Sequence, residues 1–191
     1  VHKKNDHYYY YFPIGTSLAS IPFVAAANAV GLDMISSEPA VQIFIASLTS
    51  VITLLFLFKL ARLFLNAKNA LLISSVFWFG TSLSSTAGTA LWSHNFATLF
   101  ALLAIYFSVK SAKLNESPPW YLIASFLFSA YLCRPTMAIL SPFALLFLFT
   151  YSRVAAIKTG LFLASLLGAF ILFSTHEFGQ MLPDYYLPKR L

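Results

Sequence analysis

Six apolar segments, each nearly free of charged residues, follow one another along most of the chain. They are Pro39–Phe58, Ala70–Ser85, Leu91–Val109, Trp120–Cys133, Pro135–Tyr151 and Ala155–Ser174. A helix that crosses a bilayer needs about 20 apolar residues, within a range of about 17 to 25. Only 9% of the residues are charged, whereas a soluble domain has about a quarter of its residues charged. We therefore predict an all-α, polytopic transmembrane helical bundle of about six spans.

These segments divide the 191 residues into three parts. Residues 39–174 are predicted to form the bundle, and residues 175–191 the start of an extracytoplasmic loop. Residues 1–38 are predicted to be another such loop with a juxtamembrane or re-entrant element, Ile14–Val30, which is short and contains Pro22. Because the chain opens at Val1 with no signal-peptide pattern and ends in a polar stretch, we expect an internal piece of a longer polypeptide.

Arg134 and Pro135 interrupt the apolar stretch from Trp120 to Tyr151. As one helix, this stretch would be about 48 Å long, well beyond a hydrocarbon core of about 30 Å. A residue that precedes proline is also disfavoured in helical geometry. We predict two short helices with a turn at Arg134.

Connections that are rich in basic residues alternate along the chain with connections that are poor in them. Seven lie in three of the connections and one, Arg134, in the alternate ones. The seven are Lys59, Arg62, Lys68, Lys110, Lys113, Arg153 and Lys158. An excess of Lys and Arg marks the cytoplasmic side, so the alternate connections are predicted to lie outside. The short length of Ile14–Val30 and its Pro22 favour an element on the outer face that does not cross, whereas Lys3 and Lys4 favour the alternative of a crossing that would place them in the cytoplasm. The net charge of +6 does not indicate nucleic acid, because no stretch gathers it into a basic patch.

Arg134 and His94 are the first candidates for a functional site on this outer side. An arginine in an apolar hairpin costs about 2.5–3.5 kcal/mol at mid-membrane, and its planar fork suits phosphate. The alternative is contact with ordinary lipid headgroups. His94 follows Trp92 at the start of a span, where it could bind a metal, relay a proton or bond a sugar hydroxyl, or simply lie at the interface.

Further candidates lie near the two ends of the chain. Asp6 could act as a general base, and the tyrosines after it could form either a sugar platform or an interfacial belt. The C-terminal stretch is either the cover of a pocket or a plain loop. The candidate residues of the N-terminal tyrosine run are Tyr8, Tyr9 and Tyr10, and those of the C-terminal stretch are Tyr185, Tyr186, Lys189 and Arg190.

Other signals favour structure over chemistry. Cys133 is the single cysteine, which excludes an intramolecular disulfide and favours a packing role. The serines and threonines between Ser74 and Thr86 are those expected where helices pack closely. No cofactor-binding motif is evident, and a divalent metal has no support because no second ligand stands at a suitable spacing from His94.

Four segments resemble, in order, a family of bacterial GT-C membrane glycosyltransferases, the relatives of dolichyl-phosphate-mannose–protein mannosyltransferases and lipid A aminoarabinose transferases. They are Asp6–Phe23 (DHYYYYFPIGTSLASIPF), Leu91–Ala97 (LWSHNFA), Cys133–Thr136 (CRPT) and Leu182–Leu191 (LPDYYLPKRL). The chain departs from the family pattern at His7, Ile14 and Asp184, where Gly, Pro and Pro are usual.

The resemblance implies an enzyme that transfers a sugar, with inversion, from a polyprenyl-phosphate donor to a hydroxyl of a glycan, lipid or protein acceptor. It implies a bacterial plasma membrane with the active side extracytoplasmic. Arg134, Lys189 and Arg190 would bind the lipid phosphate, and the tyrosines and His94 would line the sugar or acceptor side. The main catalytic acid would precede Val1, so that Asp6 is its neighbour and this piece lacks the acid.

The alternative is a transporter or flippase segment for a lipid-linked or amphipathic substrate. It predicts polar residues along the inner faces of several spans, whereas here the chemically rich residues gather on one side. A purely structural membrane subunit is a third interpretation.

Overall fold

The computed structural model describes residues 2–4, 7–9, 13–81, 83–87 and 90–186. This part of the chain is an all-α bundle, as predicted, with one small β-hairpin. The helices are α1 (Ile14–Ala29), α2 (Met34–Arg62), α3 (Ala67–Phe79), α4 (Leu83–Ala87), α5 (Ser93–Leu114), α6 (Trp120–Cys133), η1 (Pro135–Ile139), α7 (Leu140–Tyr151), α8 (Arg153–Phe178) and η2 (Asp184–Tyr186). The strands are β1 (His2–Lys4) and β2 (His7–Tyr9), which pair antiparallel.

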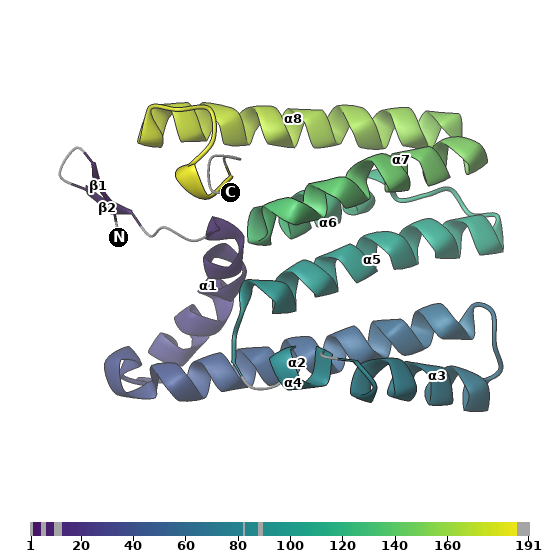
Figure 1. Cartoon of the computed structure of the whole chain (residues 1–191), viewed down its shortest axis with the longest axis horizontal. Helices are drawn as coiled ribbons and strands as arrows, with labels where there is room; N and C mark the ends of the chain where they lie inside the picture. The colour runs from purple at the N-terminus through teal and green to yellow at the C-terminus, as the bar shows by residue number, and fades with distance from the viewer. Residues whose placement is uncertain (1, 5–6, 10–12, 82, 88–89, 187–191) are drawn as a thin grey trace.

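The long helices run side by side along the longest axis of the molecule (Figure 1). Among the described helices, α2, α5 and α8 are long and apolar enough to cross a membrane, while α1, α3, α6 and the η1–α7 segment are shorter apolar helices. Six spans therefore stay a prediction, and three helices have the necessary length.

The centre of the bundle is α5, which packs between α2 and α6. Buried apolar residues of α5 to α8 form one cluster around Ile123, Leu127 and Leu148. A second cluster joins α2, α5 and the end of α6 through Ile45, Phe96 and Cys133. Three buried residues of the first cluster and one of the second are alanines, and small residues let helix backbones approach closely.

The outer surfaces of the long helices carry large apolar side chains. Phe44, Val51, Leu161 and Leu172 are each more than half exposed. Contiguous apolar surface of this kind is costly in water. It is the surface expected of helices that face lipid.

The predicted break before Pro135 is confirmed. Helix α6 ends at Cys133, Arg134 has extended backbone angles (φ −152°, ψ 110°), and η1 begins at Pro135. The proline ring disfavours helical geometry at Arg134. The Arg134 side chain thus projects from a non-helical residue between two helices.

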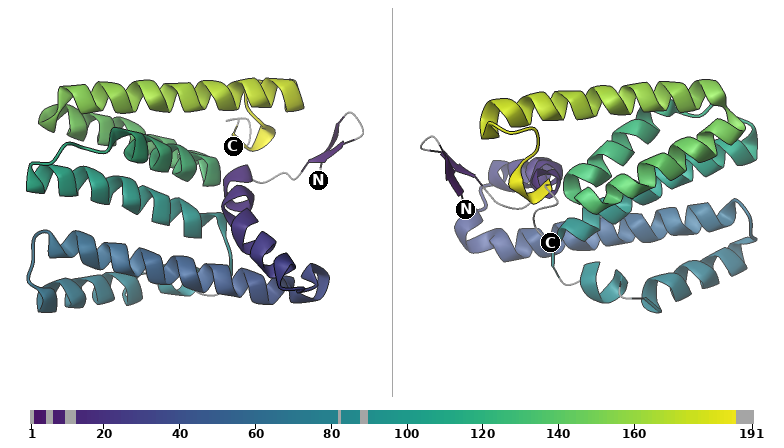
Figure 2. Two further views of the ribbon diagram at one scale, coloured as in Figure 1. Left: turned by 180° about the vertical axis from the view of Figure 1, so that it is seen from behind. Right: turned by 45° about the horizontal axis from the view of Figure 1, so that its top comes forward.

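The segment predicted as a separate juxtamembrane element forms α1, which does not run parallel to the bundle. It lies steeply across the end of the long helices, against α2, α5 and α6 (Figures 1 and 2). If the long axis follows the membrane normal, α1 lies along the membrane surface. That α1 lies on the membrane without crossing it therefore stays a prediction.

Two local features differ from the sequence-based expectation. The predicted span Ala70–Ser85 ends early, because α3 stops at Phe79 and a separate short helix, α4, follows. At this break the Thr81 hydroxyl donates to the Phe77 carbonyl and accepts from the Leu83 N–H, as short polar side chains do where they compete with helix hydrogen bonds. The hairpin of β1 and β2 was also not expected.

Candidate functional site

Four segments that lie far apart in the sequence meet at the end of the bundle where α1 lies, which we call the site end. They are the first turn of α1, the first turn of α5, the junction of α6 with η1, and η2 (Figures 1 and 2). Each belongs to one of the four segments that carry the family resemblance. Their central residues are Gly15, His94, Arg134 and Tyr186.

Arg134 is held by two neighbours. Its Nε donates to Thr136 Oγ1 at 3.1 Å, and its Nη1 meets the His94 ring, with Nε2 at 2.9 Å and Nδ1 also in contact. A guanidinium has no acceptor atom, so a ring nitrogen of His94 accepts this hydrogen bond. In the described part of the chain no ion pair involves Arg134. The half-buried guanidinium is thus fixed in orientation, and within the described residues no carboxylate pairs with its charge.

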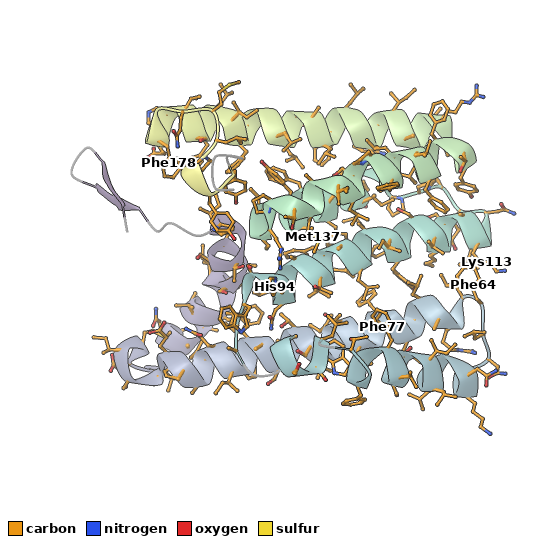
Figure 3. The ribbon with its side chains drawn as sticks, in the orientation of Figure 1. Phe64, Phe77, His94, Lys113, Met137 and Phe178 are labelled. Atoms are coloured by element: carbon orange, nitrogen blue, oxygen red, sulfur yellow. The ribbon has the colours of Figure 1, made fainter. Side chains whose placement is uncertain are left out.

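The position of His94 is set by its neighbour Asn95, which sequence reasoning missed. The Asn95 side chain is buried and accepts a hydrogen bond from the Trp92 N–H. Its amide nitrogen donates to the carbonyls of Ala87 and Ala90. Asn95 therefore ties the start of α5 to the chain before it, and a buried amide with several partners is costly to remove. Figure 3 shows His94 at this end of the bundle.

Tyr186 connects η2 to the end of α6. Its hydroxyl donates to the Leu132 carbonyl at 2.7 Å, and the Ile14 backbone also hydrogen-bonds it. Its ring centroid lies 5.4 Å from those of Tyr131 and Phe170. Burial raises the pKa of Tyr186, so the phenol remains the donor that the Leu132 carbonyl requires.

Gly15 allows the closest approach at the site end. A Cβ atom added to it would lie 2.3 Å from the Cys133 nitrogen and 2.7 Å from the Leu132 oxygen. No side chain fits at those distances, so the first turn of α1 packs directly against the backbone that precedes Arg134. Glycine at this place is explained by contact and not by backbone angles.

A cavity of about 930 Å³ opens beside these contacts, within the size range of small-molecule sites. Its walls are α1, the first turns of α2 and the segment before α5. It is lined by Pro13, Thr16, Ser17, Ser20, Val24, Met34, Ile35, Glu38, Val41, Gln42, Ile45, Leu91, Trp92, Ser93, His94 and Tyr185. Since His94 also contacts Arg134, one residue of the cavity wall is in direct contact with the guanidinium.

The remaining predicted site residues are placed as follows. Tyr185 lines the cavity, and Tyr8 and Tyr9 belong to strand β2, which stands apart from the bundle (Figure 1). Four others lie outside the described residues, namely Asp6, Tyr10, Lys189 and Arg190. Cys133 is buried in the cluster with Ile45 and Phe96.

Glu38 and Gln42 are cavity residues that sequence reasoning did not select. Both lie near other polar residues at the start of an apolar helix. The sequence alone therefore gives no sign of a functional role, because it does not show the cavity that they line. No group of three His, Cys, Asp or Glu side chains suited to a metal ion occurs within the described ranges.

A family model described as dolichyl-phosphate-mannose-protein mannosyltransferase matches residues 20–177. The chain belongs to this mannosyltransferase family. The match covers α2 to α8 almost completely and includes both His94 and Arg134, while Gly15 and Tyr186 lie just beyond its limits. Neither a curated protein nor a solved structure matches the chain.

Membership in this family indicates that the apolar helices lie in a membrane. A mannosyltransferase of this family is a membrane glycosyltransferase, and the family description names a lipid-linked sugar. Together with three helices of spanning length, this makes the chain part of a multi-pass membrane protein. The site end is then the place in this family member where a polar contact between distant segments, that of Arg134 with His94, lies beside a cavity of ligand size.

Proposed function

We propose that this chain forms part of a membrane glycosyltransferase that binds the phosphate of a polyprenyl-phosphate-linked sugar at Arg134 and transfers the sugar on the outer face. The observation that carries the proposal is the contact of Arg134 with His94 and Thr136 beside a large cavity. These two side chains orient a guanidinium whose remaining donors are available to a ligand.

The orientation follows from the distribution of basic residues. The α2–α3, α5–α6 and α7–α8 connections lie at the opposite end of the bundle, the basic end, where Figure 3 shows Lys113. The seven residues of the rich connections belong to this end or to the adjoining turns of these helices. Since Lys and Arg accumulate on the cytoplasmic side, we place the basic end in the cytoplasm and Arg134 outside.

The chemistry assigns a role to each group. The acceptor oxygen forms a bond to the anomeric carbon, the bond from that carbon to the phosphate oxygen breaks, and the acceptor proton passes to a carboxylate base. The lipid phosphate leaves with added negative charge, which a fixed cation stabilises most in the transition state. Arg134 supplies that cation with paired donors, and we propose Lys189 and Arg190 as further cations and Asp6 as a neighbour of the base.

The buried hydroxyl groups favour this enzyme over a transporter. A transport path would present polar side chains to its cargo. Within the described helices, most buried hydroxyls instead donate to carbonyls of their own helix, as Thr53, Ser74 and Ser108 do. The exceptions are Ser174, which donates to the Gln180 carbonyl just beyond α8, and Thr159, whose hydroxyl has no partner among the described residues. Such hydroxyls are used in packing, and the polar groups that face a cavity of ligand size are at the site end.

The test is transfer of labelled mannose from polyprenyl phosphate mannose, in membranes that contain the protein at its natural length. Arg134→Ala is expected to lower turnover by about 100-fold or more, the usual loss when one transition-state donor is removed. Arg134→Lys should recover part of the activity, since lysine keeps the charge but not the planar fork. Arg153→Ala, at the basic end, is the matched control and should be unaffected. Unchanged turnover in Arg134→Ala would refute the phosphate role.

A further inference from the structure

We propose that the cavity at the site end is a carbohydrate subsite in which Glu38 and Gln42 bind hydroxyl groups of a sugar ring. This inference rests on the proposed function, because it concerns the sugar that such an enzyme handles. It differs in assigning recognition of the sugar to α2, a helix that contributes nothing to the phosphate contacts.

Glu38 and Gln42 are four residues apart on α2 and so face the same side. Gln42 Nε2 donates to Glu38 Oε1 at 3.0 Å, and both residues line the cavity. This bond uses one carboxylate oxygen and one amide hydrogen. By the donor and acceptor inventory of the two side chains, the second carboxylate oxygen, the amide oxygen and the other amide hydrogen remain for a ligand. Neighbouring sugar hydroxyls, which both donate and accept, match this set.

Aromatic rings line the same cavity. Trp92 lies before α5 and is 57% exposed, so packing leaves much of its surface for a ligand. Tyr185 approaches from η2. An aromatic ring offers a flat apolar face together with a polar tip. Carboxylate, amide and aromatic side chains in one cavity therefore fit both the polar edge and the apolar face of a sugar ring.

Apart from its hydrogen bond with Gln42, Glu38 has no structural role in α2 that the described residues show. Helix α2 has 29 residues and is about 43 Å long, so its first turns extend beyond a hydrocarbon core of about 30 Å. Asp33 already caps it by accepting from the Ile35 and Ser36 N–H groups. Glu38 lies beyond the first turn, where the helix dipole has little effect, and no ion pair is recorded for it among the described residues.

The cavity is also correctly placed relative to the phosphate. His94 lines it and contacts Arg134. A phosphate bound at Arg134 would thus have its sugar, or the acceptor that attacks this sugar, next to the cavity. The donor sugar offers a hydroxylated ring, and so does the acceptor if it is a glycan. The experiment below distinguishes these two sources.

Three probes test the subsite on the protein at its natural length in lipid nanodiscs: polyprenyl phosphate mannose, polyprenyl phosphate, and methyl α-mannoside. Affinity for the lipids is measured with labelled probe, and contact with the mannoside by saturation-transfer NMR. We expect Glu38→Gln and Gln42→Met to weaken binding of a mannose-containing probe by about tenfold and to leave polyprenyl phosphate unchanged. Glu116→Gln, at the basic end, is the matched control.

An effect on polyprenyl phosphate mannose assigns the cavity to the donor sugar, and an effect on methyl mannoside alone assigns it to the acceptor. Unchanged binding of both mannose probes in both variants would overturn the subsite. Arg134→Ala should weaken the two lipids equally and leave the mannoside signal. If Arg134→Ala has no effect while the α2 variants do, the phosphate role fails and the subsite stands.

Discussion

At each end of the bundle, the hydroxyl of a tyrosine joins two distant segments, yet the two ends are organised differently. At the site end, the Tyr186 hydroxyl bonds the Leu132 carbonyl, 54 positions away. At the basic end, the Tyr151 hydroxyl bonds the carbonyls of Ser111 and Glu116. Both tyrosines tie the end of a helix to a distant segment. The difference lies in what each tyrosine holds in place.

At the basic end, most of the cation contacts are local, and the exception is Lys113, whose Nζ lies 5.4 Å from the centre of the Phe64 ring in the α2–α3 connection. Lys59 lies 4.9 Å from the centre of the Phe56 ring, and Arg153 lies 5.5 Å from that of Phe149. At the site end, Arg134 instead contacts His94, 40 positions away. Local charges are sufficient to set the direction of a helix across the membrane, whereas a binding site requires contacts between distant segments. The following predictions test that distinction.

Among variants that leave Arg134 itself in place, the largest effect is expected from Gly15→Ala. The added Cβ would overlap the backbone of Leu132 and Cys133 and push α1 away from the residues that precede Arg134. Overpacking of this kind costs about 1–3 kcal/mol. We expect a lower unfolding temperature in nanodiscs and loss of most mannose transfer.

Gly168→Ala in α8 is the control for Gly15→Ala, because an added Cβ there would meet no atom within 4 Å. It should leave mannose transfer unchanged and should not lower the unfolding temperature, because alanine is the better helix former. Equal behaviour of the two variants would show that the close approach at the site end has no functional importance.

A smaller, paired effect is expected from Tyr186→Phe and Tyr151→Phe. Each change keeps the ring and removes a hydroxyl, which costs about 1 kcal/mol of stability. Only Tyr186 holds the backbone next to Arg134, so only Tyr186→Phe should also lower transfer, by about five- to tenfold. Thermal unfolding and turnover in the same nanodisc samples separate the two outcomes. A comparable loss of turnover in Tyr151→Phe would remove the distinction between the ends.

The fold was predictable from sequence where local chemistry determines it. Long apolar runs gave the helices, and Pro135 gave the break at Arg134. The early end of α3 was missed because Gly80 and Thr81 look like ordinary members of an apolar run until the Thr81 hydroxyl is seen bonded to the backbone. Small polar residues suit either packing or a break, and their sequence does not distinguish the two.

The candidate site was predictable only in part. Arg134 and His94 were selected separately, each for its own chemistry, and their contact required the fold. Gly15 and Glu38 were not selected, since the importance of a glycine at a close approach, or of an exposed glutamate beside a cavity, depends on what lies opposite. A single sequence does not show which residues lie opposite each other in the fold.

The smallest effect is expected from Glu116→Gln. Glu116 Oε2 lies 3.6 Å from Lys110 Nζ, and the two side chains are 53% and 35% exposed. Exposed pairs of this kind contribute about 0–1 kcal/mol, and the Tyr151 bond to the Glu116 carbonyl does not depend on the side chain. The unfolding temperature should therefore change by no more than a degree or two, less still in high salt, and mannose transfer should not change. A large loss of stability would instead mean that charge pairing organises the basic end. The two ends would then differ in the kind of contact that holds them, and not in whether their contacts are local or distant.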